Sequence, residues 1–294
     1  MATTARASIT LRVKHTTRYA YAEPVSLSMH QVRLTPRTLP DQQVTGARLQ
    51  IEPPASTSST RTDYFGNEVT TFSIGDAHQE LRVTSESVVT RRGGAVTPPP
   101  SPALADAVTR LRARETDADL EAVEFLVESR LVPRGRPYAR YAAETLIADR
   151  PLFEGVAALM TAIHRDFTYD PASTTVSTPV STVLEQRRGV CQDFAHLMIA
   201  CLRSHHVAAR YVSGYLVPRA GVVGAQASHA WVSVYCPGVG WVDFDPTNDT
   251  IVAQGHVTVA LGRDYDDVSP LNGVTVGGGA HTVHVSVRVE PAPA

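Results

Sequence analysis

Hydrophobic and polar positions alternate along much of the first ninety or so residues. Ile9, Leu11 and Val13 are separated by polar residues, and the same alternation returns over 81–89. A period of two residues is typical of β-strands with one face buried and one face in water. These runs predict an N-terminal antiparallel β-domain, sandwich-like in form, over residues 1–92.

The pattern changes after a short segment rich in glycine and proline. We expect a linker over 93–102, which includes the run Pro98-Pro99-Pro100, because such runs favour extended, non-packed backbone. Beyond it lies a second domain, 103–294, in which helical periodicity comes first and alternation follows, so that the fold class is α+β. Helices are predicted over 119–131, 152–163 and 191–205, and strands near 207–217, 228–236, 240–245 and 281–290.

The charge and hydropathy of the chain exclude some classes of function. Its 294 residues include 27 Lys+Arg against 29 Asp+Glu, a formal net charge of −2, which does not fit a generically basic nucleic-acid binder. The first residues lack the apolar core of a signal peptide, and no apolar run reaches the roughly 18 residues of a membrane span. We therefore expect a cytoplasmic protein that binds neither nucleic acid nor a membrane.

Two residue counts add detail. The three cysteines, Cys191, Cys201 and Cys236, are too few and too odd in number for a disulfide scaffold, and they fit a reducing compartment. Lys14 is the single lysine among the 27 basic residues. We interpret this mainly as a compositional bias, although an enzyme that used lysine amines as acceptors would modify itself less with so few of them.

One of the three cysteines stands where a helix is predicted to begin. Gly189 ends the preceding helical run, and a helical pattern starts at Cys191. The unpaired N–H groups and the positive end of a helix favour a thiolate in its first turn and can bind a developing oxyanion. Cys191 is therefore a candidate nucleophile, with a small buried apolar residue as the alternative.

A histidine and an aspartate come together if the next two strands form a hairpin. A three-residue loop over 237–239 pairs Trp231 with Asp245 and places Asp245 diagonally beside His229 on one face, at about 7–8 Å between backbones. A two-residue loop would place them on opposite faces. Cys191, His229 and Asp245 would then supply the nucleophile, the base and the orienting carboxylate of an acyl transfer.

Three segments of the chain resemble the catalytic blocks of the transglutaminase-like superfamily, which has a papain-like core. They are GVCQDFAHL at 189–197, SHAWV at 228–232 and GWVDFDPTN at 240–248. HTTRY at 15–19, RLTPR at 33–37, DYFGN at 63–67 and GRDYDDVSP at 262–270 resemble the bacterial members. The resemblance implies a nucleophile helix packed on an antiparallel sheet, with Cys191 as nucleophile, His229 as base and Asp245 as orienting carboxylate.

The reaction is less defined than the residues. The superfamily includes cysteine proteases, amidases and amine-transferring transglutaminases, all of which pass through a thioester. We favour hydrolysis of an amide or peptide bond, because amine transfer needs a site that excludes water at about 55 M. Amine transfer and a non-catalytic binding module with a vestigial triad remain the alternatives. No metal or organic cofactor is expected, and the substrate and oligomeric state stay open.

Several other residues are weaker candidates. The backbone N–H of Cys191 and the side chain of Gln186 are the candidate oxyanion donors, and Trp231 and Trp241 are candidate walls of a substrate cleft. The loop over 218–227 is a candidate lid, since it directly precedes His229. A zinc site would need ligands drawn from Cys191, His196, Cys201, His205 and His206, and without a Cys-x-x-Cys pair we do not favour it.

Overall fold

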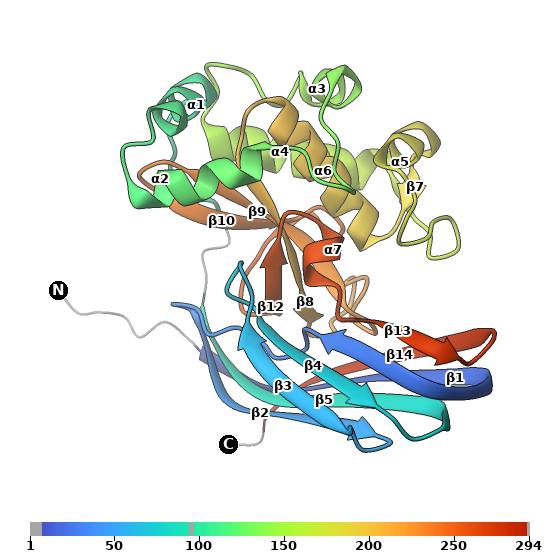
Figure 1. Cartoon of the computed structure of the whole chain (residues 1–294). Helices are drawn as coiled ribbons and strands as arrows, with labels where there is room; N and C mark the ends of the chain where they lie inside the picture. The colour runs from blue at the N-terminus through green and yellow to red at the C-terminus, as the bar shows by residue number, and fades with distance from the viewer. Residues whose placement is uncertain (1–7, 94–96, 293–294) are drawn as a thin grey trace.

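Two antiparallel sheets and a layer of helices build the molecule. The computed structural model describes residues 8–93 and 97–292. A strongly bent sheet forms the lower part of Figure 1, the helices form the upper part, and the second sheet lies between them. The predicted α+β class is confirmed.

The bent sheet is a seven-stranded half-barrel. Its path runs β2-β5-β1-β4-β3, with β13 and β14 also paired to β1. The long strand β1 passes a bulge between Ala20 and Val25, so that β14 pairs with its first part and β13 with its last. The strands are β1 (Ser8–Val32), β2 (Gln42–Glu52), β3 (Thr57–Thr62), β4 (Glu68–Ile74), β5 (His78–Arg92), β13 (Leu271–Gly277) and β14 (His281–Pro291).

The last two strands lie outside the division expected from the sequence. The strand predicted over 281–290 is present as β14, but it pairs with β1 in register from Leu11↔Pro291 to Tyr21↔His281. Two strands of the segment 103–294, β13 and β14, thus belong to the same sheet as β1. Alternation identifies a strand, whereas the choice of partner depends on residues more than 250 positions away.

The second sheet has five strands in the order β11-β10-β9-β8-β12. The β9–β10 hairpin has the register expected of a three-residue loop, from Gly240↔Cys236 to Phe244↔Val232. The strands are β8 (Ala209–Leu216), β9 (His229–Cys236), β10 (Gly240–Asp245), β11 (Thr250–Ile251) and β12 (His256–Gly262), and a separate parallel pair is formed by β6 (Thr168–Tyr169) and β7 (Arg188–Gly189).

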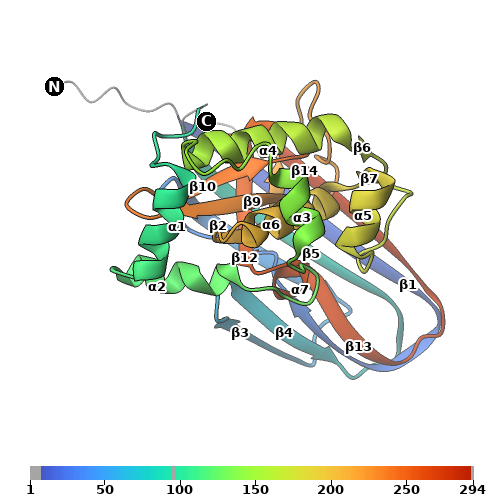
Figure 2. The same ribbon diagram turned by 90° about the horizontal axis from the view of Figure 1, so that it is seen from above.

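Helix α6 is the centre of the helical layer, with α3, α4 and α5 around it (Figure 2). Nearly all of its side chains are buried, and Phe194, Met198 and Leu202 belong to the main hydrophobic core. The helices are α1 (Leu104–Ala113), α2 (Asp117–Ala122), α3 (Arg136–Ala142), α4 (Leu152–Asp166), α5 (Val180–Gln186), α6 (Cys191–Ser204) and α7 (Tyr265–Val268). In the part of the chain with described coordinates, no helix is both long and apolar enough to cross a membrane.

The helix predicted over 119–131 is shorter in the structure. Helix α2 ends at Ala122, a 3₁₀ turn covers Val123–Leu126, and Val127 is extended. The following residues close a tight turn in which Ser129 and Val132 bond to each other's backbone. The apolar spacing predicts the helix at the start of this segment, but from Val127 onward the backbone is no longer helical and forms the turn.

Two side-chain amides join the half-barrel to the second sheet. Strand β12 lies at the edge of its sheet, and the carboxamide of Gln42 accepts from the N–H and donates to the carbonyl of Thr258, at 2.8 and 2.7 Å. Asn67 forms the same pair of bonds with Leu261. Both amide side chains are buried, so they satisfy backbone groups that an edge strand would otherwise leave unpaired.

Candidate active site

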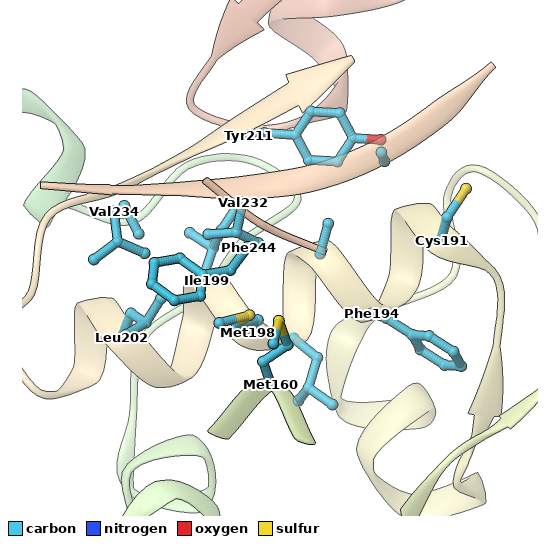
Figure 3. Close-up of a cluster of buried hydrophobic side chains, with 14 of the residues drawn as sticks. Met160, Cys191, Phe194, Met198, Ile199, Leu202, Tyr211, Val232, Val234 and Phe244 are labelled. Carbon is cyan, nitrogen blue, oxygen red and sulfur yellow. The ribbon is translucent and has the colours of Figure 1, made fainter. Parts of the chain in front are cut away.

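Cys191 is the first residue of α6, as the sequence predicts. Its neighbour Asp193 accepts a hydrogen bond from the Val190 N–H at 2.8 Å and from the Thr174 hydroxyl at 2.6 Å. These bonds fix the entry into the helix, whose first-turn N–H groups have no intrahelical acceptor. Figure 3 shows the Cys191 sulfur directed toward the strand that carries Tyr211, while Phe194 points to the other side. Cys191 thus lies at the border of the core and is 9% exposed.

His229 and Asp245 meet across the β9–β10 hairpin. The Nε2 of His229 lies 2.8 Å from Oδ2 of Asp245, and both side chains are fully buried. This leaves Nδ1 as the ring nitrogen that can face Cys191, whose proximity raises the pKa of the imidazole. Among the described residues, Nδ1 has no hydrogen-bond partner. The structure therefore brings the three predicted residues together in the order thiol, imidazole, carboxylate.

The electrostatics of the three groups favour a charged pair. Burial opposes protonation of His229, but attraction to Asp245 and Cys191 and the hydrogen bond to Asp245 outweigh it, and the pKa of His229 rises to about 10. Burial also opposes ionisation of Asp245, yet His229 and His256 hold the pKa of this carboxyl well below its usual range. At neutral pH the ring is therefore an imidazolium between the carboxylate and the sulfur.

Two residues that the sequence did not single out complete the carboxylate's surroundings. His256, on β12, donates from Nε2 to Asp245 Oδ2 at 3.2 Å, and Asn248 donates to the same oxygen from Nδ2 at 2.8 Å. The other oxygen accepts the backbone N–H groups of Thr247 and Asn248. Burial lowers the pKa of His256 despite this contact, so it acts as a neutral donor. Asn248 could have been found as part of the 240–248 motif, whereas no local signal identifies His256.

The predicted lid loop lies against the histidine. Asn248 donates to the Val223 carbonyl and accepts the Val223 N–H at 2.8 Å, which anchors the loop to the carboxylate region. Gly224 has a φ of +88°, and a Cβ at this position would stand 2.7 Å from His229 Nδ1. Glycine is thus required here both by the backbone conformation and by the close approach.

A cavity of about 310 Å³ opens beside Cys191 and His229. The second sheet and the helices supply one wall, with Gln192, Tyr211 and Tyr265. The half-barrel supplies the facing wall through β1 and β14. Besides Cys191 and His229, the described residues that line the cavity include no Asp, Glu, Lys or Arg, so the space next to this pair fits an uncharged group. The N-terminal half is therefore part of the site, a role that the sequence left open.

A buried hydrogen-bond chain crosses between the two walls. The hydroxyl of Tyr215 lies 3.1 Å from His15 Nδ1, and His15 Nε2 lies 2.9 Å from the Thr17 hydroxyl oxygen. Burial lowers the pKa of His15 to about 4, so its ring is neutral. The chain fixes two cavity-lining residues of β1 against β8.

Three weaker candidates lie away from the cavity. Gln186 is exposed at the end of α5. Trp231 is fully buried, packs edge-on against His256 and donates to Asp243 at 3.0 Å. Trp241 lies on the same face, nearer the hairpin loop, with the Arg210 guanidinium over its ring and Phe125 edge-on against it. None of the three lines the cavity.

The residues weighed for zinc are dispersed. His205 bonds to the Ala139 carbonyl, His196 accepts the Tyr265 N–H, and Cys201 is fully buried in the core. Burial raises the pKa of Cys201 strongly and that of Cys236 to about 11. These two thiols therefore stay protonated at neutral pH.

The fold and this arrangement of side chains define a papain-like thiol acyl-transfer architecture. Residues 11–90 match the bacterial transglutaminase-like N-terminal region, and residues 139–246 match the transglutaminase-like superfamily. An uncharacterised protein of Mycobacterium tuberculosis is 40% identical over 295 residues, covering 95% of this chain and 92% of its own length. The chain belongs to the transglutaminase-like superfamily.

Two further similarities frame the fold and the reaction. A crystal structure from Cytophaga hutchinsonii, of a protein proposed to be a cysteine protease, has a TM-score of 0.74 at 19% identity and covers 98% of this chain and 92% of its own. The protein-glutamine gamma-glutamyltransferase of Pseudomonas aeruginosa is 31% identical over 126 residues, which cover 38% of this chain and 18% of that protein. The first likeness is one of fold, and the second is confined to part of the chain.

Proposed function

We propose that this protein is a cysteine amidohydrolase that cleaves amide or peptide bonds through a thioester on Cys191. The observation that carries the proposal is the buried contact series from Cys191 through His229 to Asp245, opening on a cavity. In this series His229 is the acid and base and Asp245 orients its ring. A reducing compartment, the cytoplasm, suits an enzyme whose thiol must stay reduced.

The reaction begins with the Cys191 thiolate attacking the substrate carbonyl carbon, while the oxyanion accepts the first-turn N–H of α6. As the C–N bond breaks, His229 gives its proton to the leaving nitrogen, which leaves a free amine and a thioester. The neutral ring then takes a proton from water, whose oxygen attacks the thioester. The C–S bond breaks, the acid departs, and the thiolate–imidazolium pair is restored.

The burial of these groups supports an enzyme over a binding module. An ionised carboxylate and an imidazolium taken out of water cost several kcal/mol unless they are paired and hydrogen-bonded. Here Asp245 receives four donors besides His229. A surface that only binds a partner has no need of a thiol, a charged ring and so elaborate a carboxylate site.

Amine transfer is a second candidate, which the partial match to the Pseudomonas aeruginosa glutamyltransferase favours. In that reaction a primary amine replaces water in the second step. The single lysine, Lys14, forms an ion pair with Glu86 at 2.7 Å on the surface. If transfer takes place, Lys14 is the internal amine to examine for self-modification.

The test is to trap the acyl intermediate. Wild-type protein and Cys191→Ala are incubated with a set of peptide amides, with and without a labelled primary amine. The reactions are quenched in acid, and the mass of the intact protein is measured by mass spectrometry. A mass increase on wild type alone, followed by release of free acid, supports hydrolysis. Incorporation of the amine into the donor in place of free acid supports transfer. No adduct on wild type with any donor argues for the binding module.

A further inference from the structure

The strand β14 is an outer strand of the half-barrel at the place where it borders the cavity. It pairs with β1 on one side, and no strand of the described residues pairs with it on the other. Val283 and Val285 of β14 line the cavity that holds Cys191 and His229, and they are 49% and 39% exposed. An accessible sheet edge therefore lies beside the reactive thiol.

The register shows which backbone groups of β14 face outward. The Val287 N–H donates to the Gln226 carbonyl, away from β1, at 3.1 Å, whereas the Ala292 N–H donates to Thr10 of β1 at 2.8 Å. Because both backbone groups of a residue in an antiparallel strand point to the same side, and sides alternate, odd-numbered residues of β14 point outward. The N–H and C=O of Val283 and Val285 thus face away from β1.

The outward edge of β14 is already paired at one residue, next to Val283 and Val285. At Val287 the edge is paired with Gln226, and the residues that follow Gln226 line the cavity and lead to His229. Among the described residues, neither Val285 nor Val283 has a hydrogen-bond partner on this outward side. A short segment of chain could therefore add to the edge just where the loop leaves it.

We propose that the substrate is a peptide in extended conformation that adds as a strand to β14 at Val283 and Val285. This inference rests on the proposed function. Strand addition supplies main-chain hydrogen bonds, while pockets for alternate side chains supply selectivity. The uncharged cavity wall accepts small or apolar neutral residues of that peptide, and the paired edge aligns the reacting carbonyl with Cys191.

The first test uses acetyl-Ala-Ala-Ala chloromethyl ketone, in which the Cys191 sulfur displaces chloride. Three analogues each carry one N-methylated amide, and the second-order rate of adduct formation is measured by intact mass. In an extended peptide, alternate amides point toward the edge of β14. Methylation of an amide that donates to β14 removes one main-chain hydrogen bond, so we expect the rate of adduct formation to fall about tenfold. The neighbouring amide changes it less than about twofold. Equal effects at all three positions, or no effect, would overturn the proposal.

The second test removes a donor from the protein. Val285→Pro deletes the outward N–H, and an edge strand tolerates proline where the N–H is not part of the ladder. We expect the rate with the unmethylated reagent to fall about tenfold. Thr275→Pro, at an outward edge position of β13 away from the cavity, is the matched control and keeps the rate within about twofold. A full rate in folded Val285→Pro contradicts the proposal, and if that variant does not fold, the methylated series on wild type decides.

Iodoacetamide separates failure of this inference from failure of the proposed function. It is too small to pair with β14, so it reports the thiol alone. If Cys191 reacts selectively with iodoacetamide but the methylated series is uniform, the function stands and strand addition is wrong. If Cys191 is no more reactive than Cys201 and Cys236, the proposed function itself fails.

Discussion

The carboxamide of Asn67 pairs with both backbone groups of Leu261. It accepts the Leu261 N–H and donates to the Leu261 carbonyl, both at 2.8 Å, although the residues are 194 positions apart. Asn67 is itself held by Arg37, which donates to its side-chain oxygen at 2.7 Å. One amide thus takes the place of a strand residue at the edge of β12 and ties the half-barrel to the sheet that carries His229.

Asn67→Leu should destabilise the protein strongly. The substitution leaves the buried N–H and C=O of Leu261 without partners, and each unsatisfied group costs about 1–3 kcal/mol. We expect the free energy of unfolding to fall by about 2–4 kcal/mol in urea titrations. Asn272→Leu, at an exposed position of β13, is the matched control and should change it by less than about 0.5 kcal/mol. Equal effects of both substitutions would show that the hydrogen bonds between Asn67 and Leu261 do not stabilise the contact between the half-barrel and the second sheet.

Cys191 should be the thiol that iodoacetamide modifies first at neutral pH. Burial raises the pKa of Cys201 and of Cys236, so both remain thiols. We expect Cys191 to react at least about tenfold faster, and His229→Ala to abolish that advantage while the fold is kept. His284→Ala, on the opposite face of β14, should leave the rate unchanged. Peptide mapping after timed labelling measures this, and slow uniform labelling of all three would contradict the thiolate–imidazolium pair.

Gly224→Ala should disturb the histidine rather than the whole fold. The new methyl group would meet His229 Nδ1 at 2.7 Å, so the ring or the loop must move. We expect alkylation of Cys191 to slow by about tenfold or more, because the ring no longer supports the thiolate. Gly221→Ala is the matched control, since its φ of +82° carries the same backbone strain but its Cβ has no neighbour within 4 Å. If both variants behave alike, strain explains the effect and contact with the ring does not.

The stability that His229 contributes should decline toward high pH. Its pKa is raised from 6.5 to about 10 in the folded protein, so its contribution is complete below 6.5 and is lost as pH rises through 10. The difference in unfolding free energy between wild type and His229→Gln should therefore narrow steadily from pH 7 to pH 10.

His30 supplies the opposite case. Burial lowers the pKa of His30 to about 4, so its contribution is lost only as pH falls from 6.5 toward 4. The difference between wild type and His30→Gln should be flat from pH 7 to pH 10. Urea titrations across this range measure both differences, and a flat result for His229→Gln would show that the ring is not held in its charged form.

Local sequence was sufficient for the parts of the site that short-range geometry decides. The helix start at Cys191 and the hairpin that sets Asp245 beside His229 follow from a glycine break, a three-residue loop and a period of two. His256 and Gly224 could not be predicted this way, because their roles depend on which strand lies next to which and on how a loop returns. Trp231 was misplaced for the same reason: alternation defines its face of β9 but not what covers it.

The same limit applies to the wall of the cavity. Thr17 and Val285 face each other across neighbouring strands, yet 268 positions of chain separate them. Alternation marks each of them as one face of a strand and says nothing about the other. Contacts of such long range are fixed by burial of the whole sheet, and only the folded molecule displays them.

Strand β14 is synthesised after the residues of the candidate active site, although it forms one wall of the same cavity. Cys191, His229 and Asp245 leave the ribosome before β14, which follows every helix and every other strand of the described chain. A nascent chain can therefore hold all three reactive groups while one side of the cavity is still missing. If substrate adds to β14 as proposed, an incomplete chain that already carries the thiol has no edge on which to align a peptide.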